Sequence, residues 1–178
     1  MKIVPQLPPN IAAIKDRFGF RVLNPGVVFT YGDVIFNPSK VVLPPWIVYH
    51  EQTHSEQQGS SPEEWWKRYL IDDTFRLDQE LLAHQVEWAV FYKLHPSQRG
   101  LRQHTLSILA KRLSGPLYGH MIPFGEARRF IKRLTPRMER FINAAGAGRL
   151  SGREADESAR EAPDREPHED AGTAGLAG

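Results

Sequence analysis

The chain contains no cysteine, and this absence removes several classes of protein. Disulfide frameworks, zinc sites built on thiolates, redox CxxC pairs and cysteine nucleophiles are all excluded. Any zinc site in this sequence must therefore use histidine and carboxylate side chains as its ligands.

Long apolar runs are also missing. No stretch approaches the roughly 20 apolar residues that a membrane-spanning helix needs. The N-terminal residues carry only a short apolar stretch, which Pro5, Pro8 and Pro9 interrupt, and they lack the apolar middle of a secretory signal. We therefore expect a cytoplasmic protein that has no membrane partner.

The small net charge of +2 hides an asymmetry along the 178 residues. Residues 145–178 hold four arginines against eight Asp or Glu, and from position 149 onward Leu150 and Leu176 are their only large apolar residues. Such a segment cannot bury enough surface to offset the entropy lost on ordering. We predict a disordered acidic tail over 145–178, rich in Gly, Ala, Glu and Arg, and a single mildly basic domain over 1–144.

Within the domain, short β-forming runs come first. A short helix is expected near 10–17, and the β-branched and aromatic runs 20–23, 27–31 and 34–36 are bounded by turn residues, as short strands are. The rest of the domain has helical patterns and helix boundaries, which predict helices over 45–58, 61–71, 74–94, 97–114, 124–134 and 136–143. The fold class is therefore α+β and mainly α, with a small N-terminal β-sheet.

Two helix boundaries have specific signals. Gly59 follows the first long helix and is expected to end it. Ser61, Pro62 and Glu64 have the pattern of a capping box, with Ser61 as the N-cap of the next helix. Trp65-Trp66 and Trp88 lie on amphipathic helices, which indicates that they belong to the core.

The helix 45–58 contains His50-Glu51-Gln52-Thr53-His54, an HExxH motif. Residues four apart lie one turn apart on the same helix face, so both imidazoles can reach one zinc ion. Glu51 lies at the edge of that face, where a carboxylate can hold and deprotonate a water molecule. A chain of this composition in random order would contain roughly 0.02 HExxH matches. The apolar residues before the motif predict a buried helix, in which two histidines and a glutamate would be costly without a function.

A catalytic zinc ion needs a third protein ligand. Glu80 is our preferred candidate, because it lies in the middle of the helix 74–94 and Ala83 beside it would let two helices approach closely. His84 and Glu87 continue the same face, and either could orient a ligand or replace Glu80 as one.

HEQTH followed by a helical ExxA resembles the zincin superfamily of metallopeptidases in its gluzincin-like form. The resemblance covers about 31–94. It implies Zn²⁺ held by His50, His54 and Glu80, Glu51 as general base, and hydrolysis of a peptide or protein substrate. It also implies a small sheet whose edge strand pairs with an extended peptide.

The loop 114–123 contains two further candidates. Tyr118 and His120 lie in a Gly/Pro-rich segment of the kind that often supplies an oxyanion stabiliser, and we expect one of them to polarise the scissile carbonyl. The general appearance of the chain, including Pro116-Leu117-Tyr118-Gly119, is also similar to small uncharacterised zincin-like proteins of bacteriophages and prophages.

Two alternatives stay open at this point. The zinc ion could be a structural staple in a virion or regulatory protein, with His84 beside Glu80 as a fourth protein ligand that closes the site. Alternatively, the chain could be a helical module that binds nucleic acid through the basic residues of the segment 124–140, which are Arg128, Arg129, Lys132 and Arg133.

Overall fold

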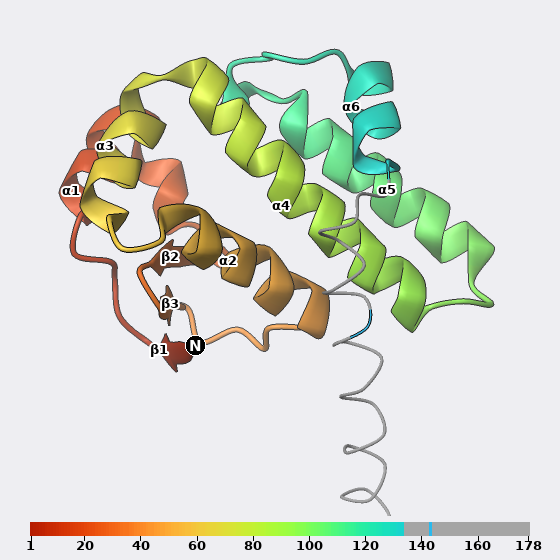
Figure 1. The fold of residues 1–178 in the computed structure, drawn as a ribbon, viewed down its shortest axis with the longest axis horizontal. Coiled ribbons are helices and arrows are strands. Elements are labelled where there is room, and N and C mark those ends of the chain that lie inside the picture. Colours follow the sequence, from red (N-terminus) through yellow and green to blue (C-terminus); the bar gives the residue numbers. More distant parts are fainter. Residues whose placement is uncertain (134–142, 144–178) are drawn as a thin grey trace, which may run out of the picture. The chain divides into compact units, whose positions relative to one another are not determined.

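The computed structural model describes residues 1–133 and 143, all of which belong to the unit Met1–Gly146. Figure 1 shows a small sheet near the N-terminus followed by helices, which confirms the α+β, mainly α fold class. The predicted helix over 136–143 and the predicted acidic tail lie outside the described residues, apart from Asn143. Within the described residues, no helix is long and apolar enough to cross a membrane.

The sheet has three short strands in the order β1-β3-β2. Strand β1 (Lys2–Val4) runs parallel to β3 (Val34–Phe36), and β2 (Phe29–Tyr31) runs antiparallel to β3 with Tyr31 opposite Val34. Gly32 has φ 61 in the two-residue turn between β2 and β3, a conformation that favours glycine. Strand β2 is therefore an edge strand of the sheet.

The predicted strand at 20–23 is wrong. Residues Phe20–Leu23 form a 3-10 helix directly after helix α1 (Ile11–Phe18), and Gly19 at φ 74 separates the two. Of the four residues only Val22 is buried, whereas Phe20 is 80% exposed. A four-residue run next to a helix end is too short for its β-forming composition to outweigh this local geometry.

Helix α2 (Pro45–Gln58) begins with a proline in its first turn and ends at Gly59, whose φ of 54 confirms the predicted stop. Helix α3 (Pro62–Ile71) begins as predicted, but the side chain of Ser61 makes no capping hydrogen bond, so the predicted capping box is wrong. The capping side chain in this region belongs to Asp72, which accepts a 2.9 Å hydrogen bond from the backbone N–H of Phe75.

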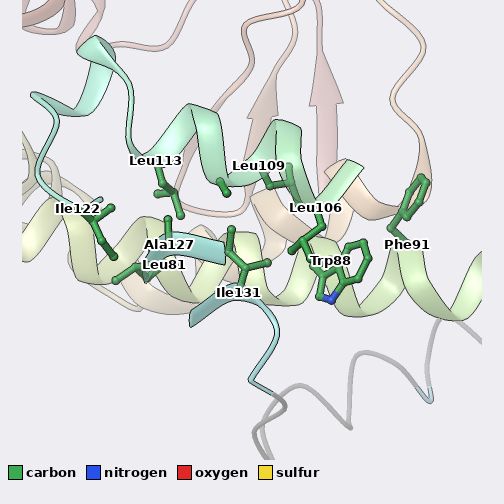
Figure 2. Close-up of a cluster of buried hydrophobic side chains, with 10 residues drawn as sticks. Leu81, Trp88, Phe91, Leu106, Leu109, Leu113, Ile122, Ala127 and Ile131 are labelled. Atoms are coloured by element: carbon green, nitrogen blue, oxygen red, sulfur yellow. The ribbon is translucent and has the colours of Figure 1, made fainter. Parts of the chain in front are cut away.

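Asp72 caps the longest helix of the described chain, α4 (Asp73–Leu94). Helices α5 (Arg99–Leu113) and α6 (Phe124–Ile131) pack on α4. Figure 2 shows the apolar cluster that they share. Its buried members are Leu81, Trp88, Phe91, Leu106, Leu109, Ala110, Leu113, Ile122, Ala127 and Ile131. Trp88 therefore belongs to the core as predicted, and so do Trp65 and Trp66, which are buried in a second cluster with Tyr69.

Helix α2 lies on α4, and this packing positions the HExxH motif. Ala83 of α4 has no exposed surface, in agreement with a close approach of the two helices. The buried residues of α2 are all polar, namely His50, Glu51, Thr53, His54 and Gln58. The apolar residues before the motif, Trp46 to Val48, are only half-buried. The helix therefore turns its polar face inward, toward α4 and β2.

Candidate metal centre

The two histidines of the motif face each other in the interior. The Nε2 atoms of His50 and His54 are 3.1 Å apart, and both side chains are buried. Glu80 of α4 faces both of them, with Oε1 3.4 Å from His54 Nε2 and Oε2 3.9 Å from His50 Nε2. Ligand atoms about 2 Å from a tetrahedral zinc ion lie roughly 3.3 Å apart. The three side chains therefore have the spacing of a zinc ligand set before any rearrangement.

Two tyrosines hold the carboxylate of Glu80. Tyr69 of α3 donates a 2.6 Å hydrogen bond to Oε1, and Tyr118, which follows α5, donates a 2.9 Å hydrogen bond to Oε2. Burial and the charge of Glu80 raise the pKa of both tyrosines well above the ordinary value, so both remain donors. The sequence does not single out Tyr69, because a tyrosine on an amphipathic helix is more often a core residue.

Glu87 is hydrogen-bonded to two imidazoles. Its Oε2 atom lies 3.1 Å from Nδ1 of His50 and 2.7 Å from Nδ1 of His84. A carboxylate accepts these bonds when each histidine carries a proton on Nδ1, and in a neutral imidazole this leaves the Nε2 atom with a lone pair. Carboxylates that contact zinc-binding histidines in this way fix the tautomer and the ring orientation. Glu87 is therefore placed to orient ligands.

The Nε2 atom of His84 has an exceptional environment. It is buried and has no hydrogen-bond partner within the described residues, and it lies 3.8 Å from Oε2 of Glu80. A buried acceptor facing a carboxylate is costly unless a cation or a donor lies between them. This orphaned nitrogen is an independent indication that the cluster accommodates a positively charged group.

The side chains of the cluster shift the pKa values of His50, Glu80 and Glu87 toward the charged forms. Burial alone would lower the pKa of His50, but its hydrogen bond to Glu87 and the charges of Glu87, Glu51 and Glu80 raise it to about 9. Burial would raise the pKa of Glu80 and of Glu87, but the neighbouring histidines hold both carboxyl groups well below their usual range. The buried carboxylates therefore stay ionised and favour a cation beside them.

A second group of potential ligands shares one histidine with the first. His50, His84 and Glu87 also have ligand atoms within 4.8 Å of one another. Their Nδ1 contacts to Glu87 have hydrogen-bond lengths, 2.7 and 3.1 Å, so direct bonding explains this group without an ion. The group of His50, His54 and Glu80 contains one contact of hydrogen-bond length, between the two Nε2 atoms, but its contacts to Glu80 are longer, 3.4 and 3.9 Å. Two imidazoles and one carboxylate are also ligand types that suit zinc.

Glu51 is buried next to the cluster and is held by the edge strand. Oε2 of Glu51 accepts a 2.8 Å hydrogen bond from the hydroxyl of Thr30 in β2. The carbonyl of Thr30 accepts two further bonds, 2.9 Å from Gln58 Nε2 and 3.0 Å from Trp66 Nε1. Strand β2 is thus fixed to α2 and α3 through one residue, whose role has no signal in the sequence.

A cavity of about 560 Å³ lies beside the cluster. His50, Glu51, His54, Glu80 and Tyr118 are among the residues that line it. Two loop segments, 25–28 and 41–44, add aliphatic and proline side chains to the lining. Of these side chains, Val42 is 93% exposed. The arrangement provides an apolar approach to a polar, buried cluster, as ligand-binding sites commonly do.

The structure brings Tyr118 to the site but not His120. Tyr118 contacts Glu80, so in this structure it supports a ligand candidate and does not point a free hydroxyl at a substrate. His120 is exposed and does not line the cavity, and its Nδ1 donates a 2.7 Å hydrogen bond to the carbonyl of Ser114. The expectation that His120 polarises a scissile carbonyl therefore has no geometric basis.

The basic residues near the C-terminal end of the domain lie away from this cluster. Arg128 and Arg129 are on α6, and Arg128 donates a 2.5 Å hydrogen bond to Gln103 of α5. Lys132 and Arg133 follow α6 and are exposed. Binding of nucleic acid by these residues stays a prediction.

The chain matches no known family model, no curated protein and no solved structure. The geometry of the cluster is therefore the basis for assigning a function.

Proposed function

We propose that this protein is a zinc-dependent metallopeptidase of the zincin type, with His50, His54 and Glu80 as ligands and Glu51 as general base. One observation carries the proposal: the buried Nε2 atoms of His50 and His54 lie 3.1 Å apart, and the carboxylate oxygens of Glu80 lie 3.9 and 3.4 Å from them. These are ligand types that zinc takes, and binding of the ion would displace the proton that His50 carries without metal.

When bound, zinc supplies Lewis acidity, which polarises a carbonyl and lowers the pKa of water to about 7. Glu51 takes a proton from the attacking water as its oxygen bonds to the peptide carbonyl carbon. Glu51 then returns this proton to the amide nitrogen as the C–N bond breaks. Thr30 holds the Glu51 carboxylate in one orientation, while Tyr69 and Tyr118 do the same for Glu80.

The proposed substrate is a peptide or an unfolded protein segment. The aliphatic loops 25–28 and 41–44 beside the cluster favour apolar side chains near the scissile bond. A substrate strand beside β2 could not pair with the carbonyl of Thr30, because Gln58 and Trp66 already occupy it. The cytoplasmic location stays an expectation from the sequence.

The proposal is tested with Glu51→Gln. Zinc-loaded wild-type protein and the variant are incubated with a pool of peptides, and new termini are measured by mass spectrometry. We expect the variant to keep its zinc and to lose about 10²–10⁴-fold in rate, the usual contribution of a general base. Glu56→Gln, on the exposed side of the same helix, is the matched control. Unchanged cleavage by Glu51→Gln would refute the proposed mechanism.

One observation favours a second candidate function. The unpartnered Nε2 atom of His84 lies 3.8 Å from Oε2 of Glu80, which makes His84 a candidate for a fourth protein ligand. Zinc sites with four protein ligands are structural. In that case the ion would stabilise a regulatory or phage-type structural protein without hydrolysis. X-ray absorption of the zinc-loaded protein distinguishes the two, with two imidazoles for the peptidase and three for the closed site.

A further inference from the structure

A second cavity, of about 480 Å³, has a strongly basic lining. Its basic residues come from α1, the following 3-10 helix, α4 and α5, and are Arg17, Arg21, Arg76, Lys111 and Arg112. The other lining residues are aromatic, glycine or proline, and no acidic side chain of the described residues is among them. Five basic side chains around one cavity produce a positive potential that attracts anions.

The acidic neighbours compensate only part of this charge. Asp73 is paired with both Arg17 and Arg76, and Glu87 lies 3.8 Å from Arg112. Arg21 and Lys111 are exposed, and neither forms an ion pair with another described residue. The cavity therefore keeps a surplus of positive charge that an incoming anion can neutralise.

Arg76 gives this cavity a buried positive charge. Its side chain is 1% exposed, its Nη1 donates a 2.8 Å hydrogen bond to the carbonyl of Tyr69, and its Nη2 contacts Asp73. The Nε atom is buried and has no hydrogen-bond partner within the described residues. A guanidinium N–H that is left without an acceptor in the interior is costly. Both Nη atoms are engaged and the guanidinium lies over the rings of Phe18 and Tyr69, so Arg76 contributes a fixed positive charge to the cavity wall. Direct contacts to an anion would come from Arg21 and Lys111.

The basic cavity adjoins the cavity of the metal centre. Phe18, Arg112 and Tyr118 line both. Tyr118 donates to Glu80, and Arg112 approaches Glu87, so these two residues connect the basic cavity to the ligand candidates. A polypeptide that lies over the metal centre could thus place a nearby negative group in the basic cavity.

We propose that the basic cavity binds a carboxylate of the polypeptide substrate, either an Asp or Glu side chain or a free C-terminus. The identity of the ligand as substrate rests on the proposed peptidase function. Binding itself does not, because it can be measured without turnover. The peptidase would accordingly prefer acidic or terminal segments that carry apolar residues beside the scissile bond.

The test uses the zinc-loaded full chain and three acetylated tripeptides. Acetyl-Ala-Ala-Glu-amide carries a side-chain carboxylate, acetyl-Ala-Ala-Ala carries a terminal carboxylate, and acetyl-Ala-Ala-Ala-amide is neutral. Inorganic phosphate is a fourth probe. Dissociation constants are measured by NMR titration for the wild type and for the double variant Arg21→Ala/Lys111→Ala. The double variant Arg99→Ala/Lys132→Ala is the matched control, because it loses the same charge at exposed positions outside the cavity.

We expect at least one carboxylate peptide to bind, with a dissociation constant that rises at least tenfold in Arg21→Ala/Lys111→Ala and changes less than twofold in the control. The carboxylate peptide that binds with the lower dissociation constant shows whether the cavity prefers a side-chain or a terminal carboxylate. The proposal would be overturned if the neutral peptide bound as tightly as the carboxylate peptides, or if both double variants lost the same affinity. Binding of phosphate alone, without either carboxylate peptide, would also overturn it. Carboxylate binding without any peptide cleavage would leave the cavity assignment intact and count against the peptidase function instead.

Discussion

The hydroxyl of Thr30 donates a 2.8 Å hydrogen bond to Oε2 of Glu51, and both side chains are buried. Thr30 lies on the edge strand β2, whereas Glu51 lies on α2 between two ligand candidates. The strand therefore determines the orientation of the carboxylate that we assign as general base. This contact makes the small sheet part of the site as well as part of the fold.

Thr30→Val should slow hydrolysis without removing zinc. The substitution conserves shape but removes the donor to Glu51, and a hydrogen bond to a charged group contributes about 1.5–3 kcal/mol. We expect a loss of roughly tenfold or more in kcat/KM, measured with a peptide that the wild type cleaves. Thr30→Ser keeps the hydroxyl and should recover most of the rate. Equal rates for wild type and Thr30→Val would contradict a role for this contact.

Glu87→Gln should weaken zinc binding. The neutral amide can no longer stabilise two Nδ1–H donors, so His50 loses its fixed tautomer. Losses of such supporting carboxylates typically cost 10–100-fold in metal affinity. Competition with a chromophoric chelator measures the change. Asp78→Asn, at an exposed position on the same helix, should leave the affinity unaltered, and an equal effect of both substitutions would argue against a specific role for Glu87.

Tyr118→Phe distinguishes two roles of the tyrosine. If the hydroxyl only holds Glu80, its loss should weaken zinc binding and leave the turnover of the fully loaded protein nearly unchanged. If the hydroxyl moves to stabilise an oxyanion, zinc binding should persist while kcat falls about 10²-fold or more. The 2.9 Å bond to Glu80 leads us to expect the first result. Tyr69→Phe, which removes the other donor to Glu80, is the reference for a purely positioning effect.

Zinc affinity should increase with pH. The raised pKa of His50, about 9, means that this imidazole carries a proton at neutral pH when no metal is bound. Zinc requires the neutral form, so binding must displace that proton. Below pH 9, each unit of decrease should weaken binding about tenfold through this group. Calorimetry in two buffers of different ionisation enthalpy should detect about one proton released from His50 per zinc at pH 7. An affinity that is independent of pH would contradict this assignment.

The sequence was sufficient for the approximate bounds of helices α2, α3, α4 and α5. The i, i+4 spacing of His50 and His54 places both on one face, and the proline and glycine signals define the bounds of α2. These features are local, so periodicity and capping residues report them directly. Glu80 was the preferred third ligand, but His84 and Glu87 stayed open, and the packing of α2 on α4 is what places Glu80 opposite the two histidines.

The parts that the sequence did not reveal depend on contacts between distant residues. Thr30 and Glu51 are 21 positions apart, and Tyr118 and Glu80 are 38 positions apart. No local pattern encodes such pairs. The apolar residues before the motif indicated a buried helix but not its buried face, which is the polar one. The run 20–23 was read as a strand, since its composition does not report the neighbouring helix end.

The most direct test of the account is the zinc content of the untagged full chain, measured by elemental mass spectrometry after purification without added metal. Wild type is compared with His54→Ala and Glu80→Ala, and with Glu56→Gln as the control, after circular dichroism shows that all are folded. We predict about one zinc per chain in the wild type and the control and nearly none in the two ligand variants. A folded wild-type protein that holds no zinc, even after zinc is added back, would contradict it.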